Sequence, residues 1–350
     1  MTEPTEGRAR STSDGAFDFE EDRSVNPLQQ VRLVLHDHPT LGPALVLLVM
    51  VVFFWLASPQ QRFLSPLNMS LIIQQVMIVG TLGIGQTIII LTAGIDLSVG
   101  AIMVLASMVM AKAQVDLGIP APIAIPIGIL VGTACGALNG LLITRLRLPP
   151  FIVTLGTMSI FFALNLYVSR SNTIRGTEMD PLMVLLGETV DILGAKITYG
   201  SIAMLTMFAI MAYILAMTRW GKHVYAIGDD PEAARLAGVR VQRMLLSVYA
   251  VAGLIYGLAA WFFIGRIGAA SPQAGGGANL DSITAVVIGG TSLFGGRGSI
   301  WGTLMGALIV GGARNGLTIM GVDALWQDFT IGVLIIGAVA LDQWVRRVGS

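Results

Sequence analysis

Polar side chains inside long apolar runs are the residues of this chain that could carry out chemistry. An amide or a charge facing lipid is unfavourable, so these side chains should face other helices or water. The set has many neutral amides and few acids, which favours a neutral polyhydroxyl solute over a cation or a proton relay. Hydrogen bonding between helices is the alternative for any single residue. We expect a solute path lined by Gln86, Asn139, Asn165, Arg314 and Asn315.

A polar segment, Gly221–Gly238, separates two of the apolar runs and carries signals for a short helix. Asp230 can cap such a helix, and Pro231 suits its first position. Glu232 suits the positive N-terminal end, and Gly238 can end the last turn. A helix presented at the surface is a contact for another protein, and a plain connecting loop is the alternative. The expected helix contains Asp230, Pro231, Glu232, Ala233, Ala234, Arg235, Leu236 and, at its end, Gly238.

Two glycine-rich junctions join neighbouring apolar runs. Glycine permits sharp turns and close helix approach, and an Asp or Ser can accept hydrogen bonds from free amides at a helix start. The first junction is therefore either a helix cap at the membrane edge or part of a discontinuous helix facing the solute path. The residues concerned are Gly94, Asp96, Ser98 and Gly100 in the first junction and Gly289, Gly290, Gly295 and Gly296 in the second.

Several kinds of enzyme chemistry have no residues to perform them. Gly221–Lys222 is followed by His223, so no phosphate-binding loop of the Gly-Lys-Ser/Thr type forms there. No metal-ligand spacing occurs, and the chain has only 3 histidines, none with a plausible nucleophile. Cys135 is the single cysteine, so no intrachain disulfide forms. We expect neither an enzyme nor a metal site, and a passage for a solute is the better hypothesis.

Composition indicates an all-α polytopic membrane protein. The 350 residues are 54% hydrophobic and 12% charged, against about 25% charged in soluble domains. Apolar runs of this kind predict membrane helices, and the third and eighth are short enough to be tilted, broken or re-entrant. We predict about ten transmembrane helices near Leu41–Ala57, Leu71–Thr92, Val99–Ala113, Pro122–Ile143, Phe151–Val168, Tyr199–Met217, Leu245–Ile264, Ile283–Phe294, Ile300–Met320 and Trp326–Val345.

The two halves of the membrane domain share a short sequence motif. Asn139–Ile143 ends the fourth run and Asn315–Ile319 ends the ninth, and both begin Asn-Gly-Leu. With alternating topology these runs point in opposite directions, which fits an inverted repeat of helices 2–5 and 7–10. Chance similarity is the alternative.

Charge asymmetry predicts the orientation. If all ten runs cross, most Lys and Arg residues fall on the side that holds both termini, which makes that side cytoplasmic. We expect residues 1–40 to be a cytoplasmic tail, partly disordered, and 41–347 to be the transmembrane domain. The tail is acidic and is not a cleavable signal. A short amphipathic stretch, Leu28–Leu35, is expected to lie on membrane lipid, with His36 and His38 beside it.

Several motifs, in the right order, resemble one known family. They are Thr92–Ala101, Leu148–Gly156, Tyr225–Ala234, Ala285–Ser299 and Ile331–Ile336. The chain resembles the permease subunit of ABC sugar importers of the ribose/xylose class, from about Leu41 to Arg347. Within that class Leu148–Phe151, Gly228–Pro231 and Ala340–Trp344 look closest to fructose-type permeases.

The resemblance implies a function and a set of partners. The chain would be a permease importing a monosaccharide across the bacterial plasma membrane, with no cofactor of its own. A second copy would complete the pathway, a separate ATPase subunit would bind ATP and Mg, and a periplasmic or extracellular sugar-binding protein would deliver the solute. No nucleic-acid partner is expected. The Asp230–Gly238 helix would be the coupling helix that contacts the ATPase.

The expected outer loops carry three arginines that suit an acidic binding protein. These are Arg170, Arg175 and Arg266, and a guanidinium can hold a carboxylate with two parallel hydrogen bonds. Contact with lipid phosphate is the alternative for all three.

Two other classes of protein remain as alternatives. An ion- or proton-coupled secondary sugar transporter would share the helices, and Asp96 would be its main candidate for a coupling acid. A membrane scaffold or receptor would give no reason for so many glycines and polar groups in the apolar runs.

Overall fold

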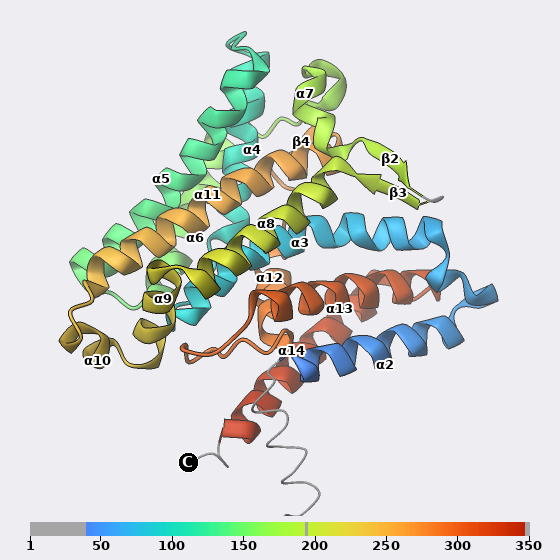
Figure 1. Ribbon diagram of the computed structural model, residues 1–350. Helices are drawn as coiled ribbons and strands as arrows, with labels where there is room; N and C mark the ends of the chain where they lie inside the picture. The colour runs from blue at the N-terminus through green and yellow to red at the C-terminus, as the bar shows by residue number, and fades with distance from the viewer. Residues whose placement is uncertain (1–39, 193–194, 347–350) are drawn as a thin grey trace, which may run out of the picture. The chain divides into compact units, whose positions relative to one another are not determined.

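Helices make up most of the described chain (Figure 1). This computed structural model describes residues 40–192 and 195–346. The expected tail, with Leu28–Leu35 and both nearby histidines, lies outside the described residues except for Thr40. All described residues belong to one compact unit, His38–Ser350.

The helices occur in a simple order along the chain. They are α2 (Leu41–Ala57), α3 (Pro66–Leu91), α4 (Val99–Val115), α5 (Ala121–Leu146), α6 (Pro150–Ser169), α7 (Pro181–Val184), α8 (Tyr199–Met217), α9 (Arg219–Asp229), α10 (Pro231–Leu236), α11 (Val241–Ile267), α12 (Ala278–Ile288), α13 (Ile300–Ile319) and α14 (Ala324–Arg346). Three short 3₁₀ turns, Pro59–Leu64, Gly176–Glu178 and Leu185–Gly187, lie in the connections.

Each of the ten predicted apolar runs overlaps a helix. Five helices are long and apolar enough to cross a membrane by length and composition: α3, α5, α6, α8 and α11. Local signals set several of the helix starts. The Ser65 side chain accepts the Asn68 N–H at the start of α3, and the Thr198 side chain accepts the Ser201 N–H at the start of α8.

The predicted eighth run was placed wrongly. Instead of Ile283–Phe294, α12 covers Ala278–Ile288, because the chain turns at Gly290, whose φ is +82°. At 11 residues α12 is about 16 Å long, too short to cross a hydrocarbon core of about 30 Å. The expectation of a short eighth segment is confirmed, but its boundaries are not.

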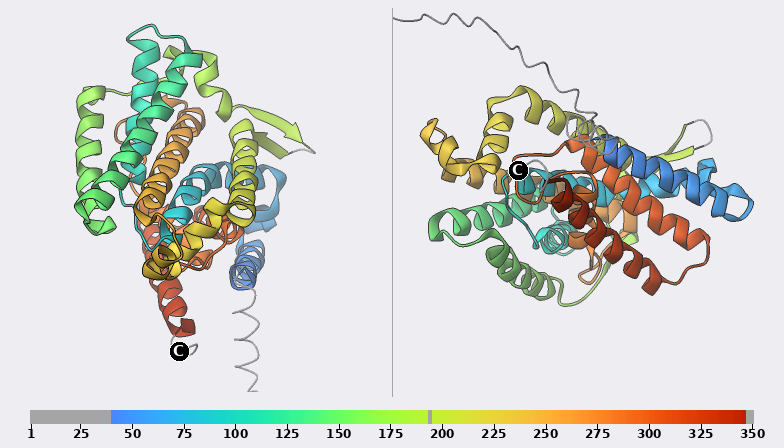
Figure 2. Two further views of the ribbon diagram at one scale, coloured as in Figure 1. Left: turned by 60° about the vertical axis from the view of Figure 1, so that its left-hand side comes forward. Right: turned by 90° about the horizontal axis from the view of Figure 1, so that it is seen from below.

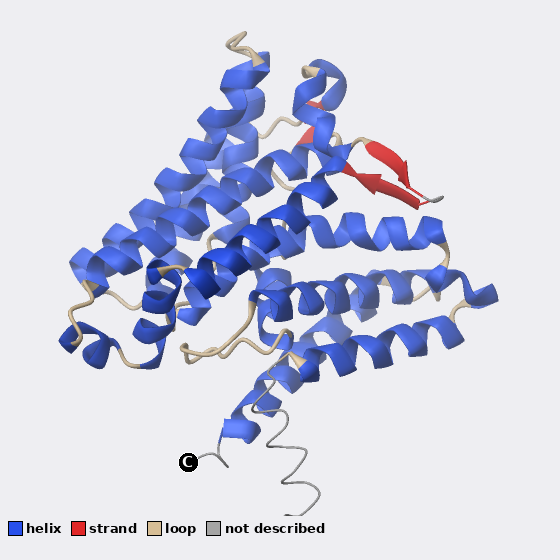
Figure 3. Cartoon of the chain, in the orientation of Figure 1, coloured by secondary structure: helices blue, strands red, loops and turns tan. Residues whose placement is uncertain are grey.

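Strands modify the all-α prediction at one end of the molecule (Figure 3). Strands β2 (Thr189–Ile192) and β3 (Ala195–Thr198) form an antiparallel pair between α7 and α8. Strand β1 (Ile174–Arg175) pairs with β4 (Ala269–Ala270), which joins the connection after α6 to the connection after α11. Two polar loops far apart in sequence therefore meet, while α9 and α10 lie at the opposite end (Figure 2).

Glycines bring α5 and α11 into close contact. A Cβ at Gly132 would lie 2.7 Å from the carbonyl oxygen of Gly253, and a Cβ at Gly257 would lie 2.8 Å from the carbonyl oxygen of Ile129. Small residues at a helix crossing let two backbones approach and maximise van der Waals contact, which is a main source of association within a membrane.

The packing of α3–α6 repeats in that of α11–α14. Helix α11 packs on α4 and α5, as α3 packs on α12 and α13. Helix α4 contacts α5 and α6, as α12 contacts α13 and α14. Exchanging the two sets of four helices therefore leaves the pattern of neighbours unchanged, as a structural repeat requires.

The α5–α11 crossing generates a stability prediction. Gly136→Ala is expected to destabilise the protein by about 1–3 kcal/mol, because the added methyl group would overlap the Tyr249 carbonyl oxygen and lie 2.8 Å from Gly253 Cα. The measurement is thermal unfolding of the purified protein in detergent. Gly156→Ala in α6 is the matched control, since a Cβ there meets nothing within 4 Å. Equal unfolding temperatures for the two variants would contradict close packing at this crossing.

Candidate functional site

Helix α9 is an amphipathic helix that the sequence reading did not separate from its neighbour α10. The Thr218 side chain caps it by accepting the Gly221 N–H. One face is buried and carries Val224, Ile227 and Gly228, whereas Lys222 is exposed. The spacing of these apolar residues is helical, so the signal for a second short helix was present in the sequence.

The buried face of α9 packs against the end of α3 and against the second glycine-rich junction, which in turn lies against Ala93 of the first. We define the first junction as Thr92–Ser98 and the second as Gly289–Ser299. The Gly296 N–H donates to the Leu91 carbonyl oxygen over 3.0 Å, which joins the second junction to the end of α3. Gly228 lies against both partners of this bond: a Cβ there would overlap the Leu91 oxygen and lie 2.5 Å from the Gly296 nitrogen.

A side chain of α9 adds to this contact between α9, the end of α3 and the second junction. The Tyr225 hydroxyl donates to the Gly298 carbonyl oxygen over 3.0 Å. Burial raises the pKa of Tyr225, so the phenol stays neutral and remains a donor. Gly295 and Gly296 have φ values of +84° and +70°, which glycine adopts without strain. Helix α9 and both junctions therefore form one packed unit.

Helix α10 has the capped structure expected from the sequence. The Asp230 side chain accepts the N–H groups of Glu232 and Ala233, and Gly238 follows the helix with a φ of +88°. Only Ala234 is buried; Glu232 and Arg235 form an exposed ion pair of 2.9 Å. Leu236 is 81% exposed, which leaves an apolar group free at the tip of the α9–α10 pair.

A buried network holds the first junction in place. The Gln86 Nε2 donates to the Asp96 carbonyl oxygen over 2.6 Å. Asp96 Oδ1 accepts the Ser98 N–H and the Ser98 hydroxyl, and Asn139 Nδ2 donates to that hydroxyl oxygen over 2.8 Å. Asp96 therefore binds an amide at the start of α4, as a cap would, within a larger set of polar groups.

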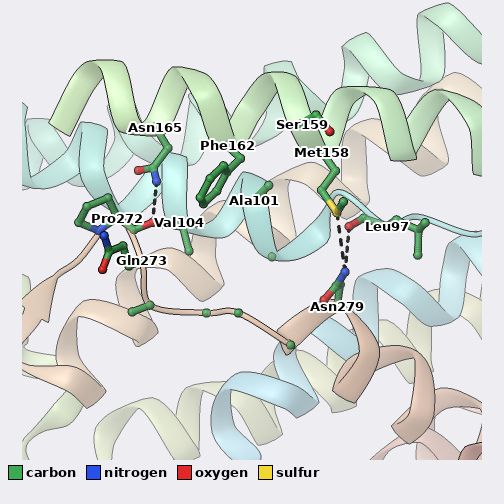
Figure 4. A pocket seen from close by; sticks show the side chains of 15 residues that line it. Leu97, Ala101, Val104, Met158, Ser159, Phe162, Asn165, Pro272, Gln273 and Asn279 are labelled. Carbon is green, nitrogen blue, oxygen red and sulfur yellow. Dashed lines mark hydrogen bonds between the residues drawn. The ribbon is translucent and has the colours of Figure 1, made fainter. Parts of the chain in front are cut away.

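The other side of the first junction lines a pocket (Figure 4). The pocket is about 300 Å³ in volume and lies between α4, α6 and the loop Pro272–Gly277. Leu97 of the junction is part of its wall, together with Met158 and Phe162 from α6. The Ile95 carbonyl oxygen accepts the Thr154 hydroxyl of α6 over 3.0 Å. The junction thus connects α9 to two walls of the pocket.

Two amide side chains shape the pocket. Asn165 Nδ2 donates to the Pro272 carbonyl oxygen over 2.9 Å, which fixes the loop against α6. Asn279 lies at the other end, with Nδ2 3.5 Å from the Leu97 carbonyl oxygen and 3.8 Å from the Met158 sulfur. The pocket therefore combines an apolar lining with a few polar groups, as small-molecule sites do.

Comparison with known proteins identifies the family. The family described as the permease component of branched-chain amino acid transport systems matches residues 68–339. The chain belongs to this permease family. Similar proteins include the fructose import permease of Rhizobium meliloti, which is 49% identical over 97% of this chain and 94% of its own length. The ribose import permease of Bacillus subtilis is 41% identical over 87% of this chain and 92% of its own, and the D-allose transport permease of Escherichia coli is 37% identical over the same shares.

Family membership and the apolar helices make the permease a multi-pass protein of the bacterial inner membrane. Its similar proteins are permease subunits of importers and not enzymes. No group of three or more His, Cys, Asp or Glu side chains that could hold a metal ion occurs among residues 40–192 and 195–346.

The five residues predicted for the solute path lie in three different places. Only Asn165 lines the pocket. Gln86 and Asn139 belong to the network at the first junction. Arg314 pairs with Asp281 at 2.9 Å and Asp328 at 3.1 Å, linking α13 to α12 and α14, and Asn315 is buried nearby on α13.

The junction glycines lie at close contacts. Gly94 faces the Tyr249 hydroxyl group, and Gly100, just beyond the first junction in the first turn of α4, faces the carbonyl oxygen of Gly275 in the pocket loop. Gly289 lies against Gly302 in α13, where only a glycine pair lets the two backbones meet. Gly290 makes the turn after α12.

The arginines of the polar loops are partly brought together. Pairing of β1 with β4 sets Arg175 opposite Ala269, three residues beyond Arg266. Arg170 ends α6 and is exposed, whereas Arg266 is half-buried in the last turn of α11.

Sequence reasoning missed several pocket residues, chiefly Leu97, Phe162, Gln273 and Asn279. The run Gly275–Gly277 next to two amides was a signal for a non-helical loop at membrane depth, which occurs only where backbone is buried in protein or lines a cavity.

Proposed function

We propose that this permease imports a monosaccharide, powered by ATP that a separate subunit hydrolyses. The similar proteins carry the names of fructose, ribose and allose permeases, and all are covered over most of their length. The identity to the fructose permease favours a fructose-type sugar. ATP and Mg would bind to the partner ATPase and not to this chain.

The observation that carries the proposal is the pocket beside the first junction. Its volume of about 300 Å³ lies at the lower end of the range of about 300–1,000 Å³ for small-ligand sites. Phe162 offers an apolar face to a sugar ring, and Gln273, Asn279 and Ser159 offer hydrogen-bonding groups to hydroxyls. This chemistry suits a neutral polyhydroxyl solute and offers no counter-charge for an ion.

Helix α10 is proposed as the coupling helix, with α9 as its lever. The exposed face of Glu232, Ala233, Arg235 and Leu236 would contact the ATPase on the cytoplasmic side, where both termini would also lie. Because α9 packs on the end of α3 and on the second junction, a push on α10 would reach the first junction, whose Leu97 lines the pocket and whose Ile95 carbonyl oxygen binds Thr154 of α6. The outcome would be alternating access, with the bound sugar favouring one state through differential contacts.

Two further partners belong to the proposal. A second copy of the permease would complete the pathway, and the matching packing of α3–α6 and α11–α14 supports an inverted repeat within each copy. A sugar-binding protein would dock on the face where the β1–β4 pair joins two polar loops, with Arg170, Arg175 and Arg266 seating its carboxylates. An ion-driven transporter, the alternative, would import sugar without any ATPase.

The pocket generates a prediction about uptake. Phe162→Ala is expected to lower uptake of the preferred sugar about tenfold at a sugar concentration below half-saturation, because the ring is lost from the pocket wall. Uptake of a panel of radiolabelled sugars by a deletion strain carrying each variant is the measurement. Tyr167→Ala on the same helix is the control, since Tyr167 is 83% exposed and lies outside the pocket lining. Equal uptake by the two variants would exclude this pocket from the path.

The coupling helix generates a second prediction. Leu236→Asp or Ala233→Asp would bury an unpaired charge at the ATPase contact. Such a charge should weaken binding of the ATPase by about 3–5 kcal/mol. Uptake should fall and the ATPase should no longer co-purify, while the permease still reaches the membrane. Leu236→Met keeps the apolar contact and should behave as wild type. Normal transport and normal co-purification by the aspartate variants would mean that α10 is only a connection.

A further inference from the structure

Buried polar atoms in and around the first junction are used by neither the cap nor the pocket. Five of them have no hydrogen-bond partner: Gln86 Oε1, Asp96 Oδ2, Asn139 Oδ1 and the hydroxyl groups of Tyr249 and Tyr256. All five residues are at most 1% exposed. An unpartnered polar group in such a place costs free energy, so a cluster of five requires an explanation.

These atoms come from four segments that meet around Asp96. Gln86 and Asn139 are bonded to the junction, Gln86 to the Asp96 carbonyl oxygen and Asn139 to Asp96 through Ser98. A Cβ at Gly94 would lie 2.7 Å from the Tyr249 hydroxyl oxygen. Gly85, which precedes Gln86 in α3, lies against the ring of Tyr256.

The network fixes which atom of each amide remains free. The Asp96 carbonyl oxygen can only accept, so the Gln86 atom facing it is the nitrogen. The Ser98 hydroxyl already donates to Asp96, so the Asn139 atom facing it is also the nitrogen. The free atoms of both amides are therefore oxygens, which only accept.

Counting donors and charge shows what is missing. The free oxygens of Gln86, Asp96 and Asn139 can only accept hydrogen bonds. The only donors among the five groups are the two phenol hydroxyls, so at least one of these three oxygens stays without a donor. Asp96 forms no ion pair within the described residues, and its Oδ1 accepts both donors from Ser98. Water would supply donors but leave the negative charge uncompensated. A small cation would supply the missing charge and takes oxygen atoms as ligands.

We propose that the first junction binds a monovalent cation of the Na⁺ type, with Asp96 as the charged ligand and the Gln86 and Asn139 carbonyl oxygens beside it. Neutral and anionic oxygens are the ligands that hard cations prefer. Unwound segments between membrane helices offer such ligands in other transport proteins. The cation would stiffen the junction that separates α9 from the pocket. This inference concerns the chain's own ligands and does not depend on which solute is imported.

The test is the thermal stability of the full-length permease in detergent, followed by tryptophan fluorescence in NaCl or in choline chloride at equal ionic strength. The melting temperature should rise with NaCl by about 2–5 °C at ten times the dissociation constant, and choline chloride should not reproduce this rise. Asp96→Asn keeps the shape of the side chain and removes its charge, so it should abolish the Na⁺ effect. Asn139→Ala should shift the half-saturating Na⁺ concentration upward about tenfold or more.

Asp281→Asn is the matched control. Asp281 is also a poorly exposed carboxylate, but Arg314 already compensates its charge. This variant should change the baseline stability and keep the Na⁺ effect. The proposal is overturned if the wild-type melting temperature is the same in both salts, or if Asp96→Asn retains the Na⁺ effect. The first result would mean that Asp96 carries a proton or is solvated by buried water.

Discussion

Three backbone segments meet at Gly228, and no side chain fits between them. The end of α3, the second junction and α9 approach so closely that a methyl group on Gly228 would overlap the Leu91 carbonyl oxygen. The Gly296 N–H bonds to that same oxygen, so the contact is both close and directional. Close-packed interiors transmit displacements instead of absorbing them. The positions of both junctions therefore depend on where α9 lies.

This constraint gives the permease a mechanical connection between α10 and the pocket. Helix α10 leaves Leu236 exposed, and α9 connects α10 directly to the packed unit. The first junction carries the connection on through Ile95 and Leu97 to α6 and the pocket. An ATPase that moves α10 could change the pocket without touching it, which is the requirement for coupling in an importer whose ATPase is a separate chain.

Much of the fold could be predicted from the sequence because apolar length and composition determine where membrane helices lie. Leu41–Ala57 and Tyr199–Met217 were predicted with the bounds of α2 and α8. The cap at Asp230 was predictable because it depends on residues within one turn. The end of α12 was not, because Leu293 and Phe294 extend the apolar run past Gly290, where the backbone turns.

The candidate site was predicted less well, because its contacts join residues far apart in the chain. Gln86 and Asn139 have the residue types of a solute path, but local sequence cannot show that each bonds to the first junction instead. Phe162 looked like any other apolar residue of α6 until the Pro272–Gly277 loop was placed beside it. Arg314 has two carboxylate partners on other helices, which no spacing rule reveals.

The most direct test of the mechanical connection is the amount of sugar imported per ATP hydrolysed by the complete importer carrying Gly228→Ala. The complex would be reconstituted with its ATPase and binding protein, and Gly156→Ala would serve as the control, since a Cβ there meets nothing within 4 Å. Displacing α9 from both junctions should lower the ratio about tenfold or more while the subunits remain assembled and ATP is still hydrolysed. A Gly228→Ala importer that assembles and keeps the wild-type ratio would contradict the account.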